Sequence, residues 1–295
     1  MPESMSLSGR TQMVGVMGWP VEHSLSPQMH NAAFAALNMD WCYVPLHVHP
    51  DQIAKAVRGL AALGFRGANA TIPHKQALLP CLNWIDPPAQ RIGAANTLVI
   101  EAPTEGHEPS RLLGYNTDAY GMLSALQSHG LVPGKNIHRV VVVGAGGAAR
   151  AVVWGLAEAG VFEITLLNRD LTRAQTLSAE LAPAICHPLP FTDETLVESV
   201  RNADLLINTT PLGMWPHPEA SIWPDSTPLP SNLAVFDLVY NPLETRLLAQ
   251  ARQAGSLPVD GLEMLVHQGA LSFKLWTGGD APVDVMRAAC LQSLR

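Results

Sequence analysis

The sequence predicts an α/β protein made of two α/β domains. Its 295 residues suit about two domains by length. A composition of 47 % hydrophobic and 15 % charged residues is typical of a globular chain with a sizeable core. Strand-like and helix-like patterns alternate along the chain, and a glycine-rich turn follows the apolar run Val140–Val143. This alternation predicts a parallel sheet with helices on both of its faces.

The part of the chain before Asn116 predicts a mixed sheet. The segments Asn96–Ile100 and Leu112–Tyr115 read as an antiparallel pair, and the polar segment Glu101–Ser110, which contains Pro and Gly, is predicted as the loop between them. Gly64 ends the helical pattern that begins at Gln52. The predicted elements before this pair are strands Val14–Met17, Trp41–His47 and Gly67–Thr71, and helices Gln28–Leu37, Gln52–Leu63 and Ile72–Trp84.

The rest of the chain repeats the strand–helix rhythm around the glycine-rich turn. Its predicted elements are helices Thr117–His129 and Thr172–Leu181 and, besides the run before the turn, strands Glu163–Asn168, Asp204–Asn208 and Ala234–Leu238. Two helical segments, Leu262–Leu275 and Val283–Leu294, have no strand after them, so we expect this tail to pack back onto the first domain. The predicted domains are therefore residues 1–117 with 262–295, and residues 118–261, with a cleft between them.

Charge and cysteine usage exclude several functional classes. A net charge of −7 provides no basic surface for nucleic acid. The cysteines are scattered without a CxxC pair, which predicts reduced thiols rather than disulfides or a zinc site. No signal peptide is evident, and no apolar run approaches the ~20 residues that span a bilayer. We expect a cytoplasmic monomer or homodimer that binds a small molecule and, because no histidines have paired ligand spacing, no metal.

The turn after Val143 has the pattern of a dinucleotide-binding loop. Gly144 would permit a tight turn, Gly146 would let a pyrophosphate approach the backbone, and Ala149 would allow close packing of helix on strand. The start of the following helix adds partial positive charge. A glycine-rich turn without a ligand is the alternative. The predicted cofactor-binding residues here are Gly144, Ala145, Gly146, Gly147 and Ala148.

The next strand favours NADP over NAD. An acidic residue at its tip would bind the ribose of NAD, whereas this strand ends at Asn168 and is followed by Arg169 and, further on, Arg173. Two guanidinium groups can bind a 2′-phosphate through charge-assisted hydrogen bonds. Asp170 is the counter-argument, because its carboxylate could reach a ribose hydroxyl. Solvated surface charge is the other explanation of the two arginines.

Polar residues also gather outside the cofactor segment. Ser24 and Ser26 precede a helical pattern; Ser26 reads as its N-cap with Pro27 at the first helical position, and the two hydroxyls also suit a substrate carboxylate. Lys75 follows an apolar strand and a Pro-restricted turn, from which it could reach a cleft. Asn96 and Asp118 complete the group, although a turn residue and a helix cap explain them equally well.

Together these segments resemble the shikimate dehydrogenase family, in order from about Val14 to Gln268. Each piece is short, but their number and order make the resemblance specific. The matching motifs are the serine pair Ser24/Ser26, Asn69-x-Thr71-x-Pro73-His74-Lys75, Gly93-Ala-Ala-Asn-Thr97, Asn116-Thr-Asp118, the glycine turn, Asn168-Arg169 with Arg173, Asn208-Thr-Thr-Pro-Leu-Gly-Met214, Asp237-x-x-Tyr240-x-Pro242 and Gly261-x-x-Met264-Leu-x-x-Gln268.

The resemblance implies an N-terminal substrate domain, a C-terminal Rossmann-like NADP domain, and reversible NADPH-dependent reduction of 3-dehydroshikimate to shikimate. It implies Lys75 and Asp118 as the catalytic pair, with the lysine stabilising the developing oxyanion and supplying the proton. The implied substrate-binding residues are Ser24, Ser26, Asn69, Thr71, Asn96, Tyr240 and Gln268. The implied cofactor-binding residues are those of the glycine turn and Asn168, Arg169, Arg173, Thr209, Thr210, Met214 and Gly261.

Three alternatives stay open. An NAD-preferring quinate/shikimate dehydrogenase would use Asp170, although a serine rather than a threonine at Ser26 favours shikimate. A non-catalytic metabolite- or nucleotide-binding member of the family would not need Lys75 and Asp118. A methyltransferase also binds its cofactor on glycine-rich turns.

Overall fold

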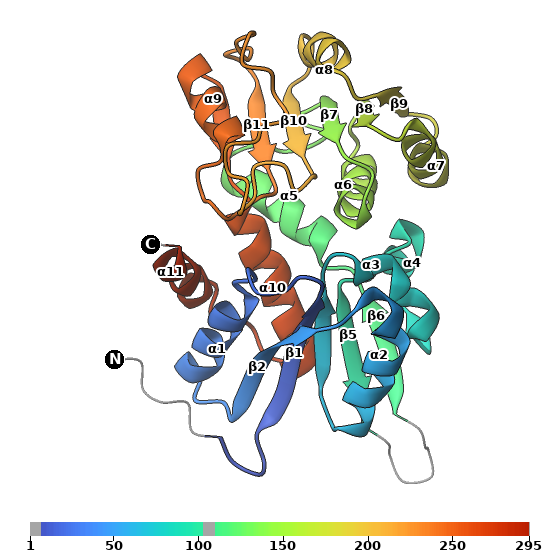
Figure 1. Cartoon of the computed structure of the whole chain (residues 1–295), viewed down its shortest axis with the longest axis vertical. Helices are drawn as coiled ribbons and strands as arrows, with labels where there is room; N and C mark the ends of the chain where they lie inside the picture. Colours follow the sequence, from blue (N-terminus) through green and yellow to red (C-terminus); the bar gives the residue numbers. More distant parts are fainter. Residues whose placement is uncertain (1–6, 103–109, 295) are drawn as a thin grey trace. The chain divides into compact units, whose positions relative to one another are not determined.

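The computed structural model describes residues 7–102 and 110–294, which form two units. One unit holds the described residues up to Thr117 together with Gln268–Ser293, and the other is Asp118–His267. The two divisions therefore fall between Thr117 and Asp118 and within helix α10 (Leu262–Thr277). Most of the predicted loop Glu101–Ser110 lies outside the described residues. Figure 1 labels the elements of each unit.

The first unit contains a six-stranded mixed sheet of order β2-β1-β3-β5-β6-β4. The strand β5 pairs antiparallel with both β3 and β6, and the other neighbours are parallel. The mixed sheet and the predicted antiparallel pair are confirmed. Its strands are β1 (Gln12–Gly18), β2 (Trp41–His47), β3 (Gly67–Ala70), β4 (Trp84–Ile85), β5 (Thr97–Glu101) and β6 (Arg111–Tyr115).

Helices cover this sheet on both faces. Val57 of α2 packs in one apolar cluster with Met17 of β1 and Leu98 of β5. On the other face, Trp276 of α10 donates a 2.9 Å hydrogen bond to the carbonyl oxygen of Leu98, and α1 packs against α11. The helical elements of this unit besides α10 are α1 (Ser26–Ala36), η1 (Pro50–Gln52), α2 (Ile53–Ala62), α3 (His74–Ala77), η2 (Leu79–Cys81), α4 (Pro87–Ile92) and α11 (Val283–Ser293).

The second unit contains a six-stranded sheet of order β12-β11-β10-β7-β8-β9 in which every neighbouring pair is parallel. The predicted α/β class and the parallel sheet are confirmed. The chain order reverses between β7 and β10, and a ligand of such a sheet binds at this switch point, beyond the carboxyl ends of the strands. The strands are β7 (Arg139–Val143), β8 (Glu163–Asn168), β9 (Cys186–Pro190), β10 (Leu205–Asn208), β11 (Ala234–Asp237) and β12 (Leu257–Val259).

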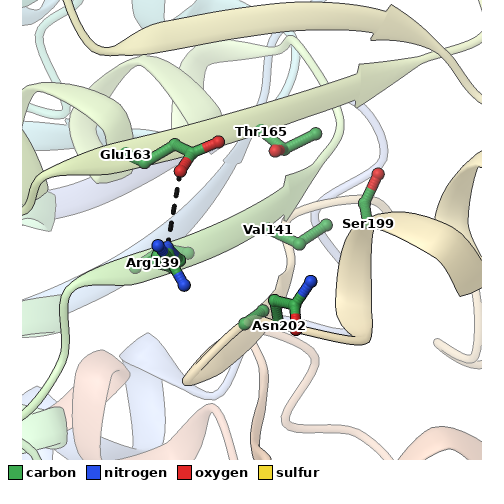
Figure 2. Close-up of a pocket in the computed structure, with 8 residues that line it drawn as sticks. Arg139, Val141, Glu163, Thr165, Ser199 and Asn202 are labelled. Atoms are coloured by element: carbon green, nitrogen blue, oxygen red, sulfur yellow. Dashed lines mark ion pairs between the residues drawn. The ribbon is translucent and has the colours of Figure 1, made fainter.

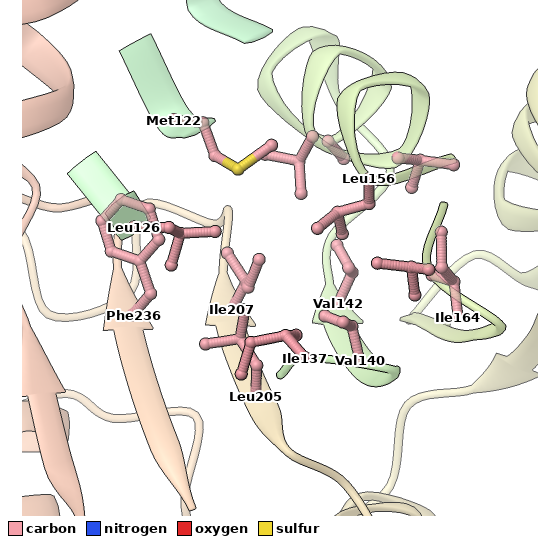
Figure 3. Close-up of a cluster of buried hydrophobic side chains, with 14 of the residues drawn as sticks. Met122, Leu126, Ile137, Val140, Val142, Leu156, Ile164, Leu205, Ile207 and Phe236 are labelled. Atoms are coloured by element: carbon pink, nitrogen blue, oxygen red, sulfur yellow. The ribbon is translucent and has the colours of Figure 1, made fainter. Parts of the chain in front are cut away.

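Alternate side chains of these strands fill two cores. Val140 and Val142 face helices α5 (Asp118–Ser128), α6 (Gly147–Glu158) and α7 (Leu171–Leu181), in the cluster shown in Figure 3. Val141 and Val143 face α8 (Asp193–Val200) and α9 (Arg246–Ala254). An uncharged run buried on both faces is typical of a central parallel strand, which explains why β7 could be predicted from its valines.

One predicted helix is wrong. The segment Ile72–Trp84 is not a continuous helix but the four-residue α3, the 3₁₀ turn η2 and the start of β4. Pro80 lies within η2, and a proline has no N–H for a helical hydrogen bond and its ring clashes with the preceding turn. The elements α4, α8, α9, β4, β9 and β12 were not predicted from the sequence. For β9 and β12 the reason is that both are short edge strands that contain prolines.

Two further structural facts bear on the excluded classes. The four cysteines are free; Cys42, Cys186 and Cys290 are buried, and Cys81 is half-buried. Among the residues described, no helix combines the length and apolar character required to cross a bilayer.

Candidate active site

The turn at the carboxyl end of β7 requires a glycine at its first position. Gly144 has φ +111°, and a Cβ atom there would lie 2.4 Å from Oγ1 of Thr209. Its N–H donates a 2.8 Å hydrogen bond to the carbonyl oxygen of Leu167, which holds the turn against β8. The conformation and the close approach both exclude a side chain.

Gly146 differs, because nothing within the fold requires it to be glycine. It is the exposed N-cap of α6, its φ of −93° is open to any residue, and a Cβ there would meet no atom within 4 Å. The open space borders the first N–H groups of α6, where the helix dipole favours an anion. Ala149 is fully buried against the sheet, as predicted. The turn is therefore shaped for a phosphate group, with Ala145, Gly147 and Ala148 half-exposed around it.

The end of β8 presents two cations. Arg169 and Arg173 are exposed, and within the described ranges neither guanidinium group has an ion pair or a hydrogen bond. Asp170 instead caps α7, because its carboxylate accepts from the backbone N–H of Arg173 at 3.3 Å. Nδ2 of Asn168 donates to the carbonyl oxygen of Asp170 at 2.8 Å. This local role of Asp170 favours a phosphate between the two arginines over a ribose on the carboxylate.

A buried hydrogen-bond network fixes the loop after β10. Asn208 and Asp237 are fully buried, and Nδ2 of Asn208 donates to Oδ1 of Asp237 at 2.9 Å. Oδ1 of Asn208 accepts from the N–H and the hydroxyl of Thr210, while Oδ2 of Asp237 accepts from the hydroxyl of Thr245. Burial raises the pKa of Asp237 to about 6, and its three hydrogen bonds oppose that shift.

The same loop is tied to the glycine turn. The N–H and hydroxyl of Thr209 both donate to the carbonyl oxygen of Val143, at 2.9 and 2.7 Å. Met214 further along the loop is 37 % exposed, so its side chain is open to a ligand. Gly261 is buried, and a Cβ there would lie 2.4 Å from the carbonyl oxygen of Leu238. No role was predicted for Asn208, Asp237 or Thr245, although the first two stand in the matching motifs.

In the first unit, the predicted cap of α1 is wrong. The helix begins at Ser26, its N-cap is Leu25, and no side chain caps it. Instead the hydroxyl of Ser24 accepts from the N–H of Ser26 at 3.3 Å. Ser26 is buried and Ser24 half-buried, so the structure brings the two serines together at the start of this helix.

Asn69, near the end of β3, is 6 % exposed, and both ends of its amide form hydrogen bonds. Oδ1 accepts from the hydroxyl of Tyr43 at 2.8 Å, and Nδ2 lies 3.1 Å from both the carbonyl oxygen of Asn96 and Oγ1 of Thr97, and 3.0 Å from Oγ of Ser272. Thr71, two residues after Asn69, is half-buried.

Asn96 and Gln268 belong to the same network. Oδ1 of Asn96 accepts from the backbone N–H of Thr117 at 2.8 Å, which directs its Nδ2 toward Oγ1 of Thr117 and Oε1 of Gln268, at 2.8 and 3.2 Å. Asn96 and Gln268 are both buried. The structure therefore brings together three amide side chains, Asn69, Asn96 and Gln268, that the sequence predicts as substrate ligands.

The predicted catalytic residues lie at the starts of helices. Lys75 is half-buried in α3, and its carbonyl oxygen accepts from the N–H of Ala95 at 2.8 Å, next to Asn96. The ring of His74 is buried and its Nε2 lies 2.8 Å from the carbonyl oxygen of Val48; burial lowers the pKa of this histidine. Asp118 begins α5 and is 3 % exposed. Tyr240 is half-buried in the segment after β11.

A cavity of about 310 Å³ in the second unit lies away from these residues. Arg139 and Glu163, which form a 3.5 Å ion pair, line it together with Thr165, Ser199 and Asn202, as Figure 2 shows. Arg139 and Glu163 begin β7 and β8, so the cavity lies at the edge of the sheet opposite the glycine turn. In the parts of the chain that the structure describes, no three His, Cys, Asp or Glu side chains group as metal ligands would.

These features define a dinucleotide-binding α/β protein with a second α/β unit that carries a buried amide network. Family models identify the family. The model described as "Shikimate dehydrogenase substrate binding domain" matches residues 16–98, "Shikimate / quinate 5-dehydrogenase" matches residues 129–212, and "Shikimate 5'-dehydrogenase C-terminal domain" matches residues 261–291.

Individual proteins of known name are similar to this chain over nearly its whole length. A shikimate dehydrogenase (NADP+) from Methanothermobacter thermautotrophicus is 45 % identical over 284 residues, 96 % of this chain and 97 % of that protein. A crystal structure of a shikimate dehydrogenase in complex with NADP+ has a TM-score of 0.88 at 36 % identity, with 100 % of both chains covered. One from Thermus thermophilus in complex with NADP(H) and shikimate has a TM-score of 0.82 at 39 % identity, covering 96 % and 100 %. The chain belongs to the shikimate dehydrogenase family.

Proposed function

We propose that this chain is an NADP-dependent dehydrogenase that reversibly reduces 3-dehydroshikimate to shikimate. One observation carries the cofactor assignment: a glycine turn open to a phosphate, followed by two exposed arginines at the tip of the next strand. The names of the relatives above support the substrate. NADPH supplies the hydride of such a reduction, so the protein must bind and orient both molecules and move one proton.

The cofactor residues divide by the part of NADP that each would hold. Gly144, Gly146 and the first turn of α6 would receive the pyrophosphate, and Arg169 and Arg173 with Asn168 would bind the 2′-phosphate. Thr209, Thr210, Met214 and Gly261 would border the nicotinamide end. The hydrogen bonds of Thr209 and Thr210 to Val143 and Asn208 keep this loop in place before the cofactor arrives.

Proton transfer is assigned to Lys75, with Asp118 as its acidic partner. The ketone oxygen gains negative charge during reduction, and an ammonium group within hydrogen-bond reach stabilises that charge and supplies the proton. A carboxylate partner favours the protonated form of a lysine. Ser24 and Ser26 would bind the carboxylate of the substrate, Asn69, Thr71, Asn96 and Gln268 its ring hydroxyls, and Tyr240 would close the carboxylate end.

The domains follow from the same assignment. We take residues 1–117 with 262–295 as the substrate-binding catalytic domain and residues 118–261 as the dinucleotide-binding domain, in a cytoplasmic enzyme that acts on small molecules as a monomer or homodimer. The presence of Lys75 and Asp118 argues against a family member that only binds its ligands, because such a protein would not need a pair of residues for proton transfer.

Initial rates with shikimate and quinate, each measured with NADP+ and NAD+, test the proposal. We expect activity with shikimate and NADP+ to exceed every other combination. Comparable rates with quinate or NAD+ would instead support the broader-specificity dehydrogenase. A folded protein without activity in any combination would support the binding-only alternative.

A further inference from the structure

A buried serine of α10 lies at the centre of the amide network. Ser272 is fully buried, and its hydroxyl donates to the carbonyl oxygen of Gln268, one helical turn earlier, at 3.0 Å. Its oxygen lies 3.0 Å from Nδ2 of Asn69, 2.8 Å from Oγ1 of Thr97 and 3.3 Å from Oγ1 of Thr117. None of the motifs discussed above contains Ser272, and the proposed reaction gives it no role.

The hydroxyl of Ser272 has one proton and two lone pairs. Because the proton goes to the carbonyl oxygen of Gln268, the lone pairs of the Ser272 hydroxyl are left to accept hydrogen bonds, and Nδ2 of Asn69 donates to one of them. Ser272 therefore acts toward Asn69 as an acceptor. An acceptor at this position attracts the NH₂ end of the amide and disfavours its oxygen end.

Tyr43 acts on the opposite end of the same amide. Its hydroxyl donates to Oδ1 of Asn69 at 2.8 Å, and its ring stacks on His30 with centroids 4.4 Å apart. The amide of Asn69 is thus oriented from both ends, with Oδ1 directed at Tyr43 and Nδ2 directed at Ser272, the carbonyl oxygen of Asn96 and Oγ1 of Thr97. A carbonyl oxygen has a second lone pair, so Asn69 in this orientation can only accept a hydrogen bond from a substrate.

We propose that Ser272 is a positioning residue which, through Asn69, makes the substrate site an acceptor for a ring hydroxyl. This inference rests on the function proposed above and adds to it a specific chemistry, because the group that Asn69 receives must itself be a hydrogen-bond donor. Ser272 acts without contacting the substrate. A substrate carrying a ketone or an ether oxygen at that position would meet a repulsive oxygen.

The substitution Ser272→Ala tests the proposal. We expect the KM for shikimate to rise roughly five- to tenfold, which corresponds to the loss of one buried hydrogen bond, while the KM for NADP+ and kcat change less than about twofold. Ser199→Ala is the matched control, because the Ser199 hydroxyl also donates to the carbonyl oxygen four residues earlier but, among the residues that the structure describes, forms no hydrogen bond with an amide side chain. It should leave all three constants unchanged.

A double-mutant cycle separates positioning from a general loosening of α10. In an Asn69→Ala background, Ser272→Ala should raise the KM for shikimate less than about twofold further, because the residue through which it acts is gone. If Ser272→Ala retains its full effect there, the proposal is overturned. Should Ser272→Ala not fold, Tyr43→Phe removes the other orienting bond and must give the same split and the same non-additivity.

The activity of the wild-type protein distinguishes a failure of the role proposed for Ser272 from a failure of the proposed function. A wild-type enzyme that oxidises shikimate, combined with an unchanged KM in Ser272→Ala, overturns the positioning role and leaves the proposed function intact. A folded wild-type protein that does not act on shikimate overturns the proposed function, and the role of Ser272 falls with it.

Discussion

The side-chain amide of Asn208 donates a 2.9 Å hydrogen bond to Oδ1 of Asp237, and this bond joins the carboxyl ends of the adjacent strands β10 and β11. The other end of the Asn208 amide holds Thr210, and the other oxygen of Asp237 holds Thr245 at the start of α9. A chain of buried polar groups therefore supports the loop that is proposed to border the nicotinamide.

Substitutions of Asp237 should show how much this network contributes to the free energy of unfolding. Asp237→Ala leaves the donors of Asn208, Val239 and Thr245 buried without their acceptor, so we expect the free energy of unfolding to fall by about 3 kcal/mol and the KM for NADP+ to rise. Asp237→Asn keeps one acceptor oxygen and nearly the same shape, and should lose about half as much. Chemical denaturation of both variants measures the difference; equal stability of the two would contradict the role of the network.

Two neighbouring glycines should respond in opposite ways to the same substitution. Gly144→Ala forces a side chain into a positive φ and against Thr209, so it should lower the free energy of unfolding by about 2 kcal/mol or more. Gly146→Ala should lower the melting temperature far less than Gly144→Ala, because its Cβ meets no atom of the protein and only the weaker N-cap preference of alanine is lost. It should nevertheless raise the KM for NADP+ roughly tenfold or more, because the methyl group would occupy the space left for the pyrophosphate. A KM for NADP+ near the wild-type value in Gly146→Ala would show that the pyrophosphate does not bind at this turn.

The two arginines after β8 should determine cofactor choice. Arg169→Ala and Arg173→Ala should each weaken NADP+ binding by roughly tenfold or more, with little effect on NAD+, because a charge-assisted bond to the 2′-phosphate is lost. Titration calorimetry with both cofactors gives the ratio. Arg201→Ala, which removes an exposed arginine paired with Glu198, is the control and should change neither affinity. Equal losses for NADP+ and NAD+ would mean that these arginines do not bind the 2′-phosphate.

Lys75 should affect turnover and not cofactor affinity. We expect Lys75→Ala to lower kcat by about 10²–10⁴-fold, the range typical of a lost general acid, with the Kd for NADP+ nearly unchanged. Lys55→Ala removes an exposed lysine of α2 from the same unit and should keep full activity. A kcat near the wild-type value in Lys75→Ala would remove this residue from the proposed mechanism.

His30 should make the fold sensitive to mild acid. Burial lowers its pKa from 6.5 to about 3, and both ring nitrogens are without a hydrogen-bond partner in the part of the chain described. The unfolded chain therefore takes up a proton below pH 6.5 while the folded chain does not, so stability is fully present above that pH and is lost as the pH falls. From pH 7 to 5.5, wild type should lose about 1 kcal/mol relative to His30→Phe, measured by denaturation at both pH values. A constant difference between the two proteins would show that His30 does not contribute.

Hydrophobic patterning predicted the long elements well and the short ones poorly. The strands Trp41–His47 and Glu163–Asn168 have the bounds predicted for them, because their apolar side chains fill cores that the pattern already indicates. The segment Ile72–Trp84 was predicted wrongly as one helix, because Pro80, which lies in η2, cannot continue an α-helix. The edge strand β9 was missed because its sequence, CHPLP, contains two prolines and only one buried residue.

The sequence by itself determined the α/β class and, through the number and order of the motifs that resemble the shikimate dehydrogenase family, the kind of protein and the candidate residues, although each motif alone has another physical explanation. The tertiary structure decided which contacts those residues form. It assigned Asp170 to the cap of α7, replaced the expected cap of α1 by a contact between two serines, and oriented Asn69 between Tyr43 and Ser272. Ser272 is 203 positions from Asn69 along the chain. Hydrogen bonds between such distant side chains depend on how helix and strands pack, which no local pattern encodes.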